Sequence, residues 1–162
     1  MQILPYMPDP QTTAELIDLI LFCQNTEAHL GITMAEHPDV LMIQDYYQAR
    51  GGQFWVATQD GHVAGCIALL PVDHDTTVLK KFFTYPQFRG GAVHLGWQLY
   101  QTLLTYAQAQ PFKRLVLDTP EAEHRSHQFY ERQGFKQITF DQLGVTYAFP
   151  DRHSRFYALN LA

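Results

Sequence analysis

The stretch from Lys80 to Gly96 constrains the fold more than any other part of the 162-residue chain. An aromatic strand, Lys81-Phe82-Phe83-Thr84, runs through Pro86 into Arg89-Gly90-Gly91-Ala92-Val93-His94-Leu95-Gly96 and then into an amphipathic helix. The first N–H groups of a helix have no partner inside the helix, and glycines let the preceding turn gather several of them around an anion. This order predicts a phosphate cradle, with a plain tight connection as the alternative.

Periodicity places further elements on both sides of this turn. Apolar residues recur at helical spacing from Leu16 to Leu21, which predicts a largely buried helix. The Asp60-Gly61 pair between two apolar runs predicts a β-hairpin. The expected order is strand 2–6, helices 13–24 and 38–47, strands 54–57, 63–70 and 76–84, helix 97–108, strand 113–118, helix 122–133, and strands 136–140 and 155–161. We therefore expect an α/β (α+β) fold with a mixed, mostly antiparallel central sheet flanked by helices.

Composition indicates one domain over residues 1–162, because 46% hydrophobic content can build a core without metals or disulfides. The net charge of -5 argues against a nucleic-acid partner, which normally requires a basic stripe. Cys23 and Cys66 lie in apolar segments, so we expect two small buried residues in a reducing cytoplasm. No apolar run approaches the length that spans a bilayer, which predicts a soluble intracellular protein without a membrane partner.

Two ordered motifs resemble the GNAT superfamily of N-acetyltransferases. Gln87-Phe88-Arg89-Gly90-Gly91-Ala92 is similar to the acetyl-CoA loop of that family, Gln/Arg-x-x-Gly-x-Gly/Ala. Phe129-Tyr130-Glu131-Arg132-Gln133-Gly134-Phe135 matches the later signature, an apolar residue followed by Tyr-Glu-x-x-Gly-Phe. The resemblance implies a GNAT-like fold, acetyl-CoA as the cofactor, and transfer of an acetyl group to an amine.

The resemblance also implies where acetyl-CoA binds. Backbone groups of the strand would hold the pantetheine arm, the turn would hold the pyrophosphate, and Ser126 would contact the cofactor. Arg89 either adds a charge-assisted contact to a phosphate or is an ordinary solvated arginine, and His94 has the same two options. The implied cofactor-binding residues are Phe82, Phe83, Thr84, Arg89, Gly90, Gly91, Ala92, Val93, His94, Leu95, Gly96 and Ser126.

The loop departs from the family spacing, because extra residues follow Arg89-Gly90 before His94-Leu95-Gly96. Either Gly91-Ala92 or His94-Leu95-Gly96 forms the inner turn. The phase of the downstream leucines favours a loop lengthened by about two residues, with Gly96 opening the helix.

Within this resemblance Tyr130 is the candidate general acid, since a phenol with a pKa of about 10 keeps its proton at neutral pH and can offer it to sulfur. The alternative is a tyrosine packed in the core beside Phe129. The general base stays open, because Val78 stands where many relatives carry a glutamate. A water chain without one dominant base is an equal option. The other candidates are Glu27, Glu36, His74, His124 and His127.

Substrate choice should depend on the segments 26–47 and 145–153. The candidate acceptor-binding residues there are Glu27, Tyr46, Tyr147 and Arg152. We therefore expect an acetyl-CoA-dependent N-acetyltransferase acting on a primary amine of a small molecule or peptide. The alternatives are a weak or inactive acyl-CoA-binding sensor and, third, an interaction domain without CoA. Homodimerisation, common in such folds, is a further option.

Overall fold

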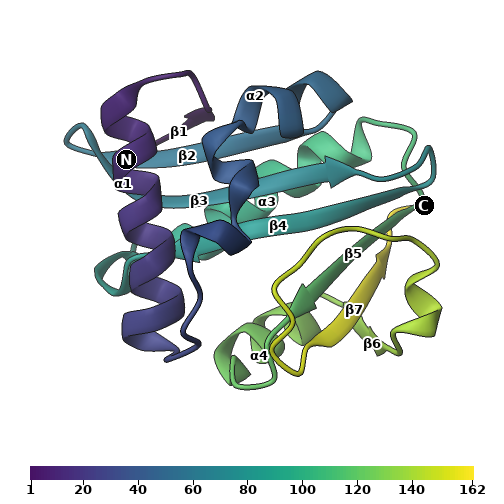
Figure 1. Ribbon diagram of the computed structural model, residues 1–162. Coiled ribbons are helices and arrows are strands. Elements are labelled where there is room, and N and C mark those ends of the chain that lie inside the picture. Colours follow the sequence, from purple (N-terminus) through teal and green to yellow (C-terminus); the bar gives the residue numbers. More distant parts are fainter.

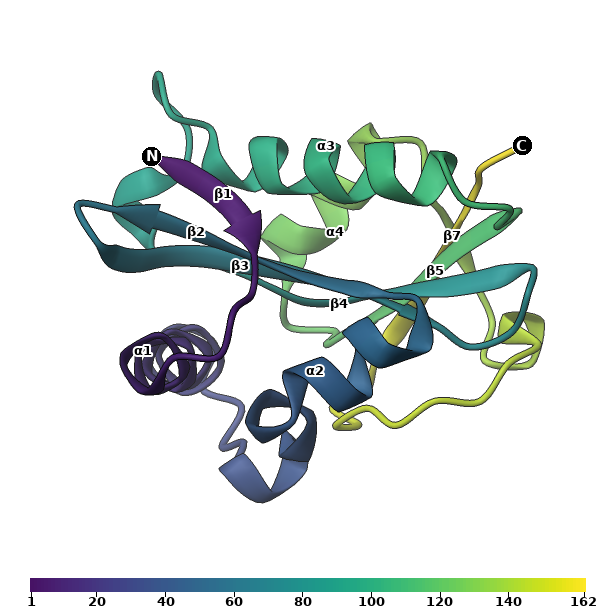
Figure 2. The same cartoon turned by 90° about the horizontal axis from the view of Figure 1, so that it is seen from above.

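The computed structural model describes residues 1–162 as one sheet with helices on both faces. The seven strands lie in the order β1-β2-β3-β4-β5-β7-β6, and only β4 and β5 are parallel neighbours. Figure 2 shows α1 and α2 on one face of the sheet and α3 and α4 on the other. The elements are β1 Gln2–Pro5, α1 Pro10–Leu21, η1 Phe22–Glu27, η2 Met34–Glu36, η3 Pro38–Leu41, α2 Ile43–Tyr46, η4 Gln48–Arg50, β2 Gln53–Gln59, β3 His62–Pro71, β4 Thr76–Thr84, η5 Pro86–Phe88, α3 Leu95–Gln108, β5 Arg114–Thr119, α4 His124–Arg132, β6 Lys136–Ile138, η6 Asp141–Leu143 and β7 Arg155–Asn160.

Each face of the sheet has its own core. Leu95, Leu99 and Leu103 of α3 pack with Leu115 and Leu117 of β5 on one face. On the other face, Leu16 and Leu19 of α1 pack with Val78 of β4 and Val116 of β5. Side chains alternate between faces along a strand, so every second residue of β5 belongs to the same core. Both predicted features, the mostly antiparallel sheet and its flanking helices, are confirmed.

The hairpin prediction is also confirmed. Strands β2 and β3 are joined by Asp60 and Gly61, both with positive φ (53° and 81°), as a tight two-residue turn requires. Cys23 and Cys66 are buried free thiols, as expected of small core residues.

The first helix begins and ends differently from the prediction. It begins at Pro10, because the Asp9 side chain accepts the Thr12 N–H at 2.9 Å and caps it. Beyond Leu21 the chain continues as a π-helix, η1, instead of ending at Gln24. Such wider turns change which side chains face a neighbouring site, and here Cys23, Gln24 and Glu27 all face the cavity described below.

The predicted helix 38–47 is wrong as one element. It consists of a 3-10 turn, η3, and a short helix, α2, separated by Met42 at φ -144°. The break lets Val40, Ile43 and Tyr47 all pack inward while Asp39 turns toward β4. No helix in the structure is both long and apolar enough to cross a membrane.

Candidate active site

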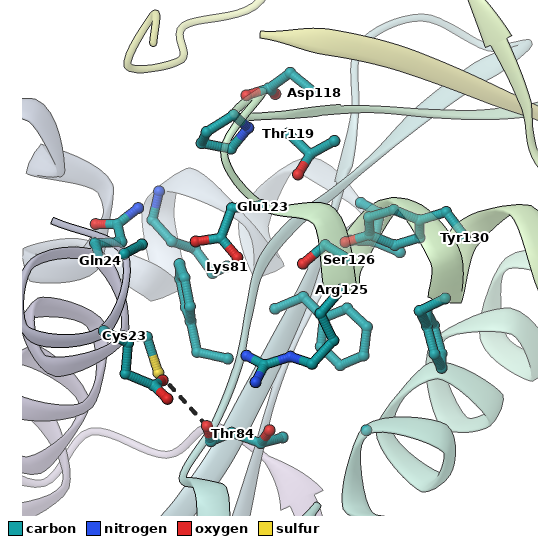
Figure 3. Close-up of a pocket in the computed structure, with 18 of the residues that line it drawn as sticks. Cys23, Gln24, Lys81, Thr84, Asp118, Thr119, Glu123, Arg125, Ser126 and Tyr130 are labelled. Atoms are coloured by element: carbon teal, nitrogen blue, oxygen red, sulfur yellow. Dashed lines mark hydrogen bonds between the residues drawn. The ribbon is translucent and has the colours of Figure 1, made fainter. Parts of the chain in front are cut away.

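The central feature of the site is the divergence of β4 and β5. They pair only between Thr76–Val78 and Arg114–Val116, and beyond this point they separate (Figure 1). From Leu79 onward, one edge of β4 therefore has no strand partner, and its backbone groups on that side are free to pair with a ligand. A cavity of about 750 Å³ opens there, between η1 on one side and α4 on the other (Figure 3).

A β-bulge shapes the β4 wall of the cavity. Cys66 pairs with Phe83 and Ala68 with Lys80, so β4 holds one more residue than β3 over this stretch. Lys81 and Phe82 together stand opposite Ile67, and Lys81 has a φ of 52°. Bulges re-aim side chains and are frequent beside active sites. Here Lys80 and Lys81 are both buried neighbours that line the cavity.

The glycine-rich loop stands at one end of the cavity. Gly90 (φ 67°) and Gly91 (φ 56°) are both left-handed, and the His94 N–H donates to the Gly90 carbonyl at 3.0 Å. The N–H groups of Gly91, Ala92 and Val93 donate to no backbone acceptor. Helix α3 begins at Leu95, one residue before the predicted start at Gly96.

The loop residues do not all reach the cavity. Gly90, His94 and Gly96 line it, together with Arg89 before them. Leu95 is instead fully buried in the core on the α3 face of the sheet, and Val93 packs against that core. Gly91 and Ala92 do not line the cavity either. Phe82, Phe83, Thr84 and Ser126 line the cavity as well. The structure thus gathers most, though not all, of the residues expected to bind the cofactor.

Arg89 differs from both expectations, since it is neither free for a phosphate nor simply solvated. Its guanidinium donates to the two Glu27 carboxylate oxygens at 2.8 and 2.7 Å and to the Thr84 side chain at 3.1 Å. This hydrogen bonding lowers the pKa of Glu27. The fork geometry of arginine suits a carboxylate as well as a phosphate, so Glu27 holds the group that the loop would present to an anion.

Tyr130 extends from α4 into the cavity near Ser126 (Figure 3). Its ring is 6% exposed and packs against Phe135 and Phe82. Burial, and then the Asp118 charge, raise the pKa of Tyr130 well above its ordinary value. The ordinary pKa expected for Tyr130 is therefore wrong, because the ring is packed in the core beside Phe129, as the alternative expected. The phenol holds its proton even more firmly than expected.

Most of the candidate acceptor-binding residues lie outside the cavity. Only Glu27 lines the cavity. Tyr46 packs on Tyr47 and under Arg50. Tyr147 lies behind Lys80, whose ammonium is 5.4 Å from its ring. Arg152 pairs with Glu36 at 2.9 Å and donates to the Leu30 carbonyl at 3.1 Å, so these contacts join two segments.

The candidate bases are mostly engaged or remote. His74 is exposed in the turn before β4, Glu36 pairs with Arg152, and the buried His127 contacts the Pro120 carbonyl at 3.0 Å. His124 reaches the cavity rim but is exposed. Val78 is fully buried in the core, so no carboxylate stands at that position of β4.

Sequence reasoning missed a group of charged and polar side chains in the cavity. A signal was present, because two lysines inside an apolar strand and an aspartate at a strand end are unusual in a core. The missed residues are Gln24, His37, Lys80, Lys81, Asp118, Glu123 and Arg125.

Two of these groups are held from the α2 side of the sheet. The Lys81 ammonium lies 3.1 Å from Asp39, which also accepts the Tyr47 hydroxyl at 2.5 Å. Burial opposes the charge on Asp39, but Lys81 and Tyr47 together lower its pKa. Lys80 donates to the Ala148 carbonyl at 2.6 Å, and burial, followed by the Lys81 charge, lowers its pKa to about 8.

Comparison with known proteins identifies this arrangement. Residues 16–135 match the acetyltransferase (GNAT) family, which is most of the chain. The chain belongs to the GNAT family of acetyltransferases. The cavity between β4 and β5 is thus the candidate active site of a GNAT domain.

Solved structures agree with the family at the level of the fold. An acetyltransferase from Streptococcus agalactiae is 55% identical, with a TM-score of 0.95 over 98% of this chain and 97% of that one. A GNAT acetyltransferase from Elizabethkingia anophelis, solved with acetyl-CoA bound, is 19% identical with a TM-score of 0.63, covering 98% and 97% of the two chains.

Among curated proteins, the N-acetylaspartate synthetase of Homo sapiens is 29% identical over 127 residues. The match covers 77% of this chain but only 41% of the synthetase. The GNAT domain described here thus spans less than half the length of that relative.

The GNAT cavity has a donor set that fits acetyl-CoA. The free N–H groups of Gly91, Ala92 and Val93 lie next to the cavity end lined by Gly90 and His94 and suit a phosphate-bearing end, and the unpaired edge of β4 suits an arm that contains amides. The residues that line the cavity extend from Gly90 and His94 past Phe82 to Asp118 and Phe149. One cavity therefore offers groups to the phosphate-bearing end and to the amide-bearing arm of the ligand.

Proposed function

We propose that this GNAT domain is an acetyl-CoA-dependent N-acetyltransferase that acetylates a primary amine of a small molecule or peptide by direct attack. The observation that carries the proposal is the unpaired edge of β4, which lies in one cavity with the glycine-rich loop and Tyr130. Acetyl-CoA would supply the acetyl group as a thioester.

The backbone of β4 and the loop divide the binding of acetyl-CoA. Phe82, Phe83 and Thr84 offer backbone groups to the pantetheine arm, as a neighbouring strand would. The N–H groups of Gly91, Ala92 and Val93, which donate to no backbone acceptor, would be offered to the pyrophosphate. Ser126, at the start of α4, lies where it can contact the arm from the opposite wall.

Tyr130 acts as the general acid for the departing sulfur. Its raised pKa keeps the phenol protonated at neutral pH, and its ring is fixed by the aromatic side chains around it. A fixed donor is useful because proton transfer depends on position before acidity.

The acceptor amine approaches from the side of η1, η3 and the segment before β7. Gln24, Ile32, His37 and Phe149 line that part of the cavity. The synthetase named above forms an acetylated amino acid, so the first acceptor panel contains aspartate, the other free amino acids and short peptides with free N-termini.

The proposal is tested in two steps. Thermal unfolding with and without acetyl-CoA comes first, because a ligand that binds only the native state raises its stability. Release of the CoA thiol with the amine panel follows. A thermal shift without thiol release would favour the acyl-CoA sensor, and no shift at saturating acetyl-CoA would remove both functions and leave the interaction domain.

Tyr130→Phe should lower turnover by about 10²-fold or more while the thermal shift by acetyl-CoA persists. The matched control is Tyr100→Phe. Tyr100 is also buried, its hydroxyl has no hydrogen-bond partner, and it lies outside the cavity. Equal losses in the two variants would remove the acid role of Tyr130.

Homodimerisation stays a separate prediction, to be checked by light scattering.

A further inference from the structure

Two carboxylates in or beside the cavity are already neutralised by partners in the chain. Glu27 is bound by Arg89, and Asp39 is bound by Lys81 and Tyr47. Both have a lowered pKa for these reasons. A carboxylate held in this way is a poor proton acceptor, because its charge is already stabilised.

Two cavity carboxylates, Asp118 and Glu123, have no ion pair. Burial raises the pKa of both side chains above the ordinary value. A raised pKa strengthens a carboxylate as a base, since proton transfer is most efficient when the pKa approaches the working pH. The two residues lie on different walls of the cavity.

Asp118 is the last but one residue of β5, just beyond the point where β4 and β5 separate. Val116 faces the α1 core and Leu117 the α3 core, so the alternation of the strand turns Asp118 toward the α1 side. That is the side from which the acceptor enters. Figure 3 shows Asp118 at the opposite end of the cavity from Thr84.

The groups around Asp118 come from three elements. Lys80 and Lys81 face it from β4, Tyr130 from α4, and Tyr147 from the segment before β7. The lysine charges oppose the effect of burial and favour the ionised form of Asp118. The Tyr147 hydroxyl is a donor beside the carboxylate, and its hydrogen bonding likewise favours the ionised form of Asp118.

We propose that Asp118 is the general base of this acetyltransferase and takes the proton from the acceptor ammonium. This assignment rests on the proposed function. Asp118 would supply the base that Val78 on β4 cannot, because Val78 is a buried apolar residue. The base would then lie on β5 instead of β4.

Asp118 accepts one proton from the ammonium: an N–H bond breaks and a carboxyl O–H bond forms. The neutral nitrogen forms its bond to the acetyl carbon as the carbon–sulfur bond breaks. Tyr130 gives its proton to the sulfur and regains the second nitrogen proton, and Asp118 releases its proton to water. The products are an amide, a free thiol and one solvent proton.

Glu123 is the competing carboxylate. The charges that face it are those of Arg125, Glu27 and Arg89, so it belongs to the charged cluster near the loop. It lies at the start of α4, close to Ser126, on the wall proposed for the pantetheine arm. The position of Asp118 on the acceptor side favours it over Glu123.

The deciding experiment compares two acceptors in Asp118→Asn. One is the best amine of the panel, which is an ammonium ion at neutral pH. The other is hydroxylamine, which is already unprotonated there and needs no base before attack. We expect turnover of the amine to fall by about 10²-fold or more and that of hydroxylamine to change little.

The pH profile supplies a second signature. In the wild type, the rate with the amine should level off once Asp118 is ionised. In Asp118→Asn it should keep rising about tenfold per pH unit toward the pKa of the amine, since only the neutral fraction reacts. Carbon NMR of labelled aspartate carboxyls gives a readout without turnover: one resonance should titrate above the ordinary pKa of about 3.9 and vanish in the variant.

Glu123→Gln is the matched variant, and the acetyl-CoA thermal shift of Asp118→Asn shows that it folds. Equal loss with both acceptors, or no loss, overturns the assignment, as does acceptor-selective loss in Glu123→Gln. Wild-type protein that is stabilised by acetyl-CoA but acetylates neither amine overturns the enzyme function and this assignment with it. Activity of the wild type combined with an unaffected Asp118→Asn overturns the assignment alone.

Discussion

Several charged side chains in or near the cavity depend on partners far away in the chain. Arg89 is bound by Glu27, Lys81 by Asp39, and Arg152 by Glu36. The Lys81–Asp39 pair is the most buried, with side chains 5% and 6% exposed. Loss of one partner there would leave a buried charge unpaired, which costs far more than loss of a surface pair.

Glu27→Gln should release Arg89 and tighten acetyl-CoA binding, because a negative charge leaves the site of an anionic ligand. The free energy of unfolding should fall by about 1 kcal/mol or less, since the pair is partly exposed. Arg89 lowers the folded-state pKa of Glu27, so this stabilisation is present above the unfolded value of about 4.3 and is lost as pH falls through the folded value. Calorimetric titration with acetyl-CoA measures the affinity.

Glu121→Gln is the control for that titration. Glu121 also binds an arginine through two bonds, to Arg155 at 2.6 Å each, but it does not line the main cavity. Weaker binding by Glu27→Gln, or the same change in both variants, would contradict the release of Arg89.

At the scale of elements, the bulge in β4 decides which groups enter the cavity. Gly65 on β3 lies behind the bulge, and a Cβ atom there would lie 2.9 Å from the Phe83 carbonyl oxygen and 3.0 Å from Leu95 Cδ2. The first neighbour is backbone, so a side chain at this position would push β4 away from β3.

Gly65→Ala should therefore destabilise the fold by about 1–3 kcal/mol and weaken acetyl-CoA binding, because Phe83 and Thr84 would shift. Urea unfolding measures the first effect and the thermal shift by acetyl-CoA the second. Gly96→Ala is the contrast, since its Cβ would meet Phe82 only at 3.6 Å within α3, where alanine is favoured over glycine. Equal stability of Gly65→Ala and the wild type would show that β4 can yield at no cost.

At the scale of the whole molecule, the acceptor side of the cavity is built from segments that are distant in sequence. Arg152 joins the segment before β7 to Leu30 and Glu36. These contacts link the two segments that sequence analysis expected to select the acceptor. The link is structural and does not require Arg152 to touch the substrate.

Arg152→Gln should loosen both segments while the acetyl-CoA end stays intact. Amide hydrogen exchange should accelerate in residues 29–42 and 145–153, and the thermal shift by acetyl-CoA should persist. Arg155→Gln, which breaks the pair with Glu121, provides the control. Unchanged exchange in both segments would show that Arg152 does not hold them together.

The sequence alone determined the features that depend on neighbouring residues. The Asp60-Gly61 turn, the apolar spacing of the first helix and the strand, glycine loop and helix around Gly90 all come from local geometry, so their fold could be predicted. The position of Tyr130 in the candidate site followed from a motif. Boundaries were less certain, because caps such as Asp9 and the break at Met42 depend on single contacts.

Only the tertiary structure decided which charged side chains of the site are paired and how deeply they are buried. Arg89 meets Glu27, Lys80 and Lys81 enter one cavity through a bulge, and Asp118 is left without an ion pair where two strands part. None of these follows from periodicity, because each depends on burial and on residues brought together across the sheet. Electrostatic energies depend on such distances and on exclusion of water, which exist only once the chain has folded.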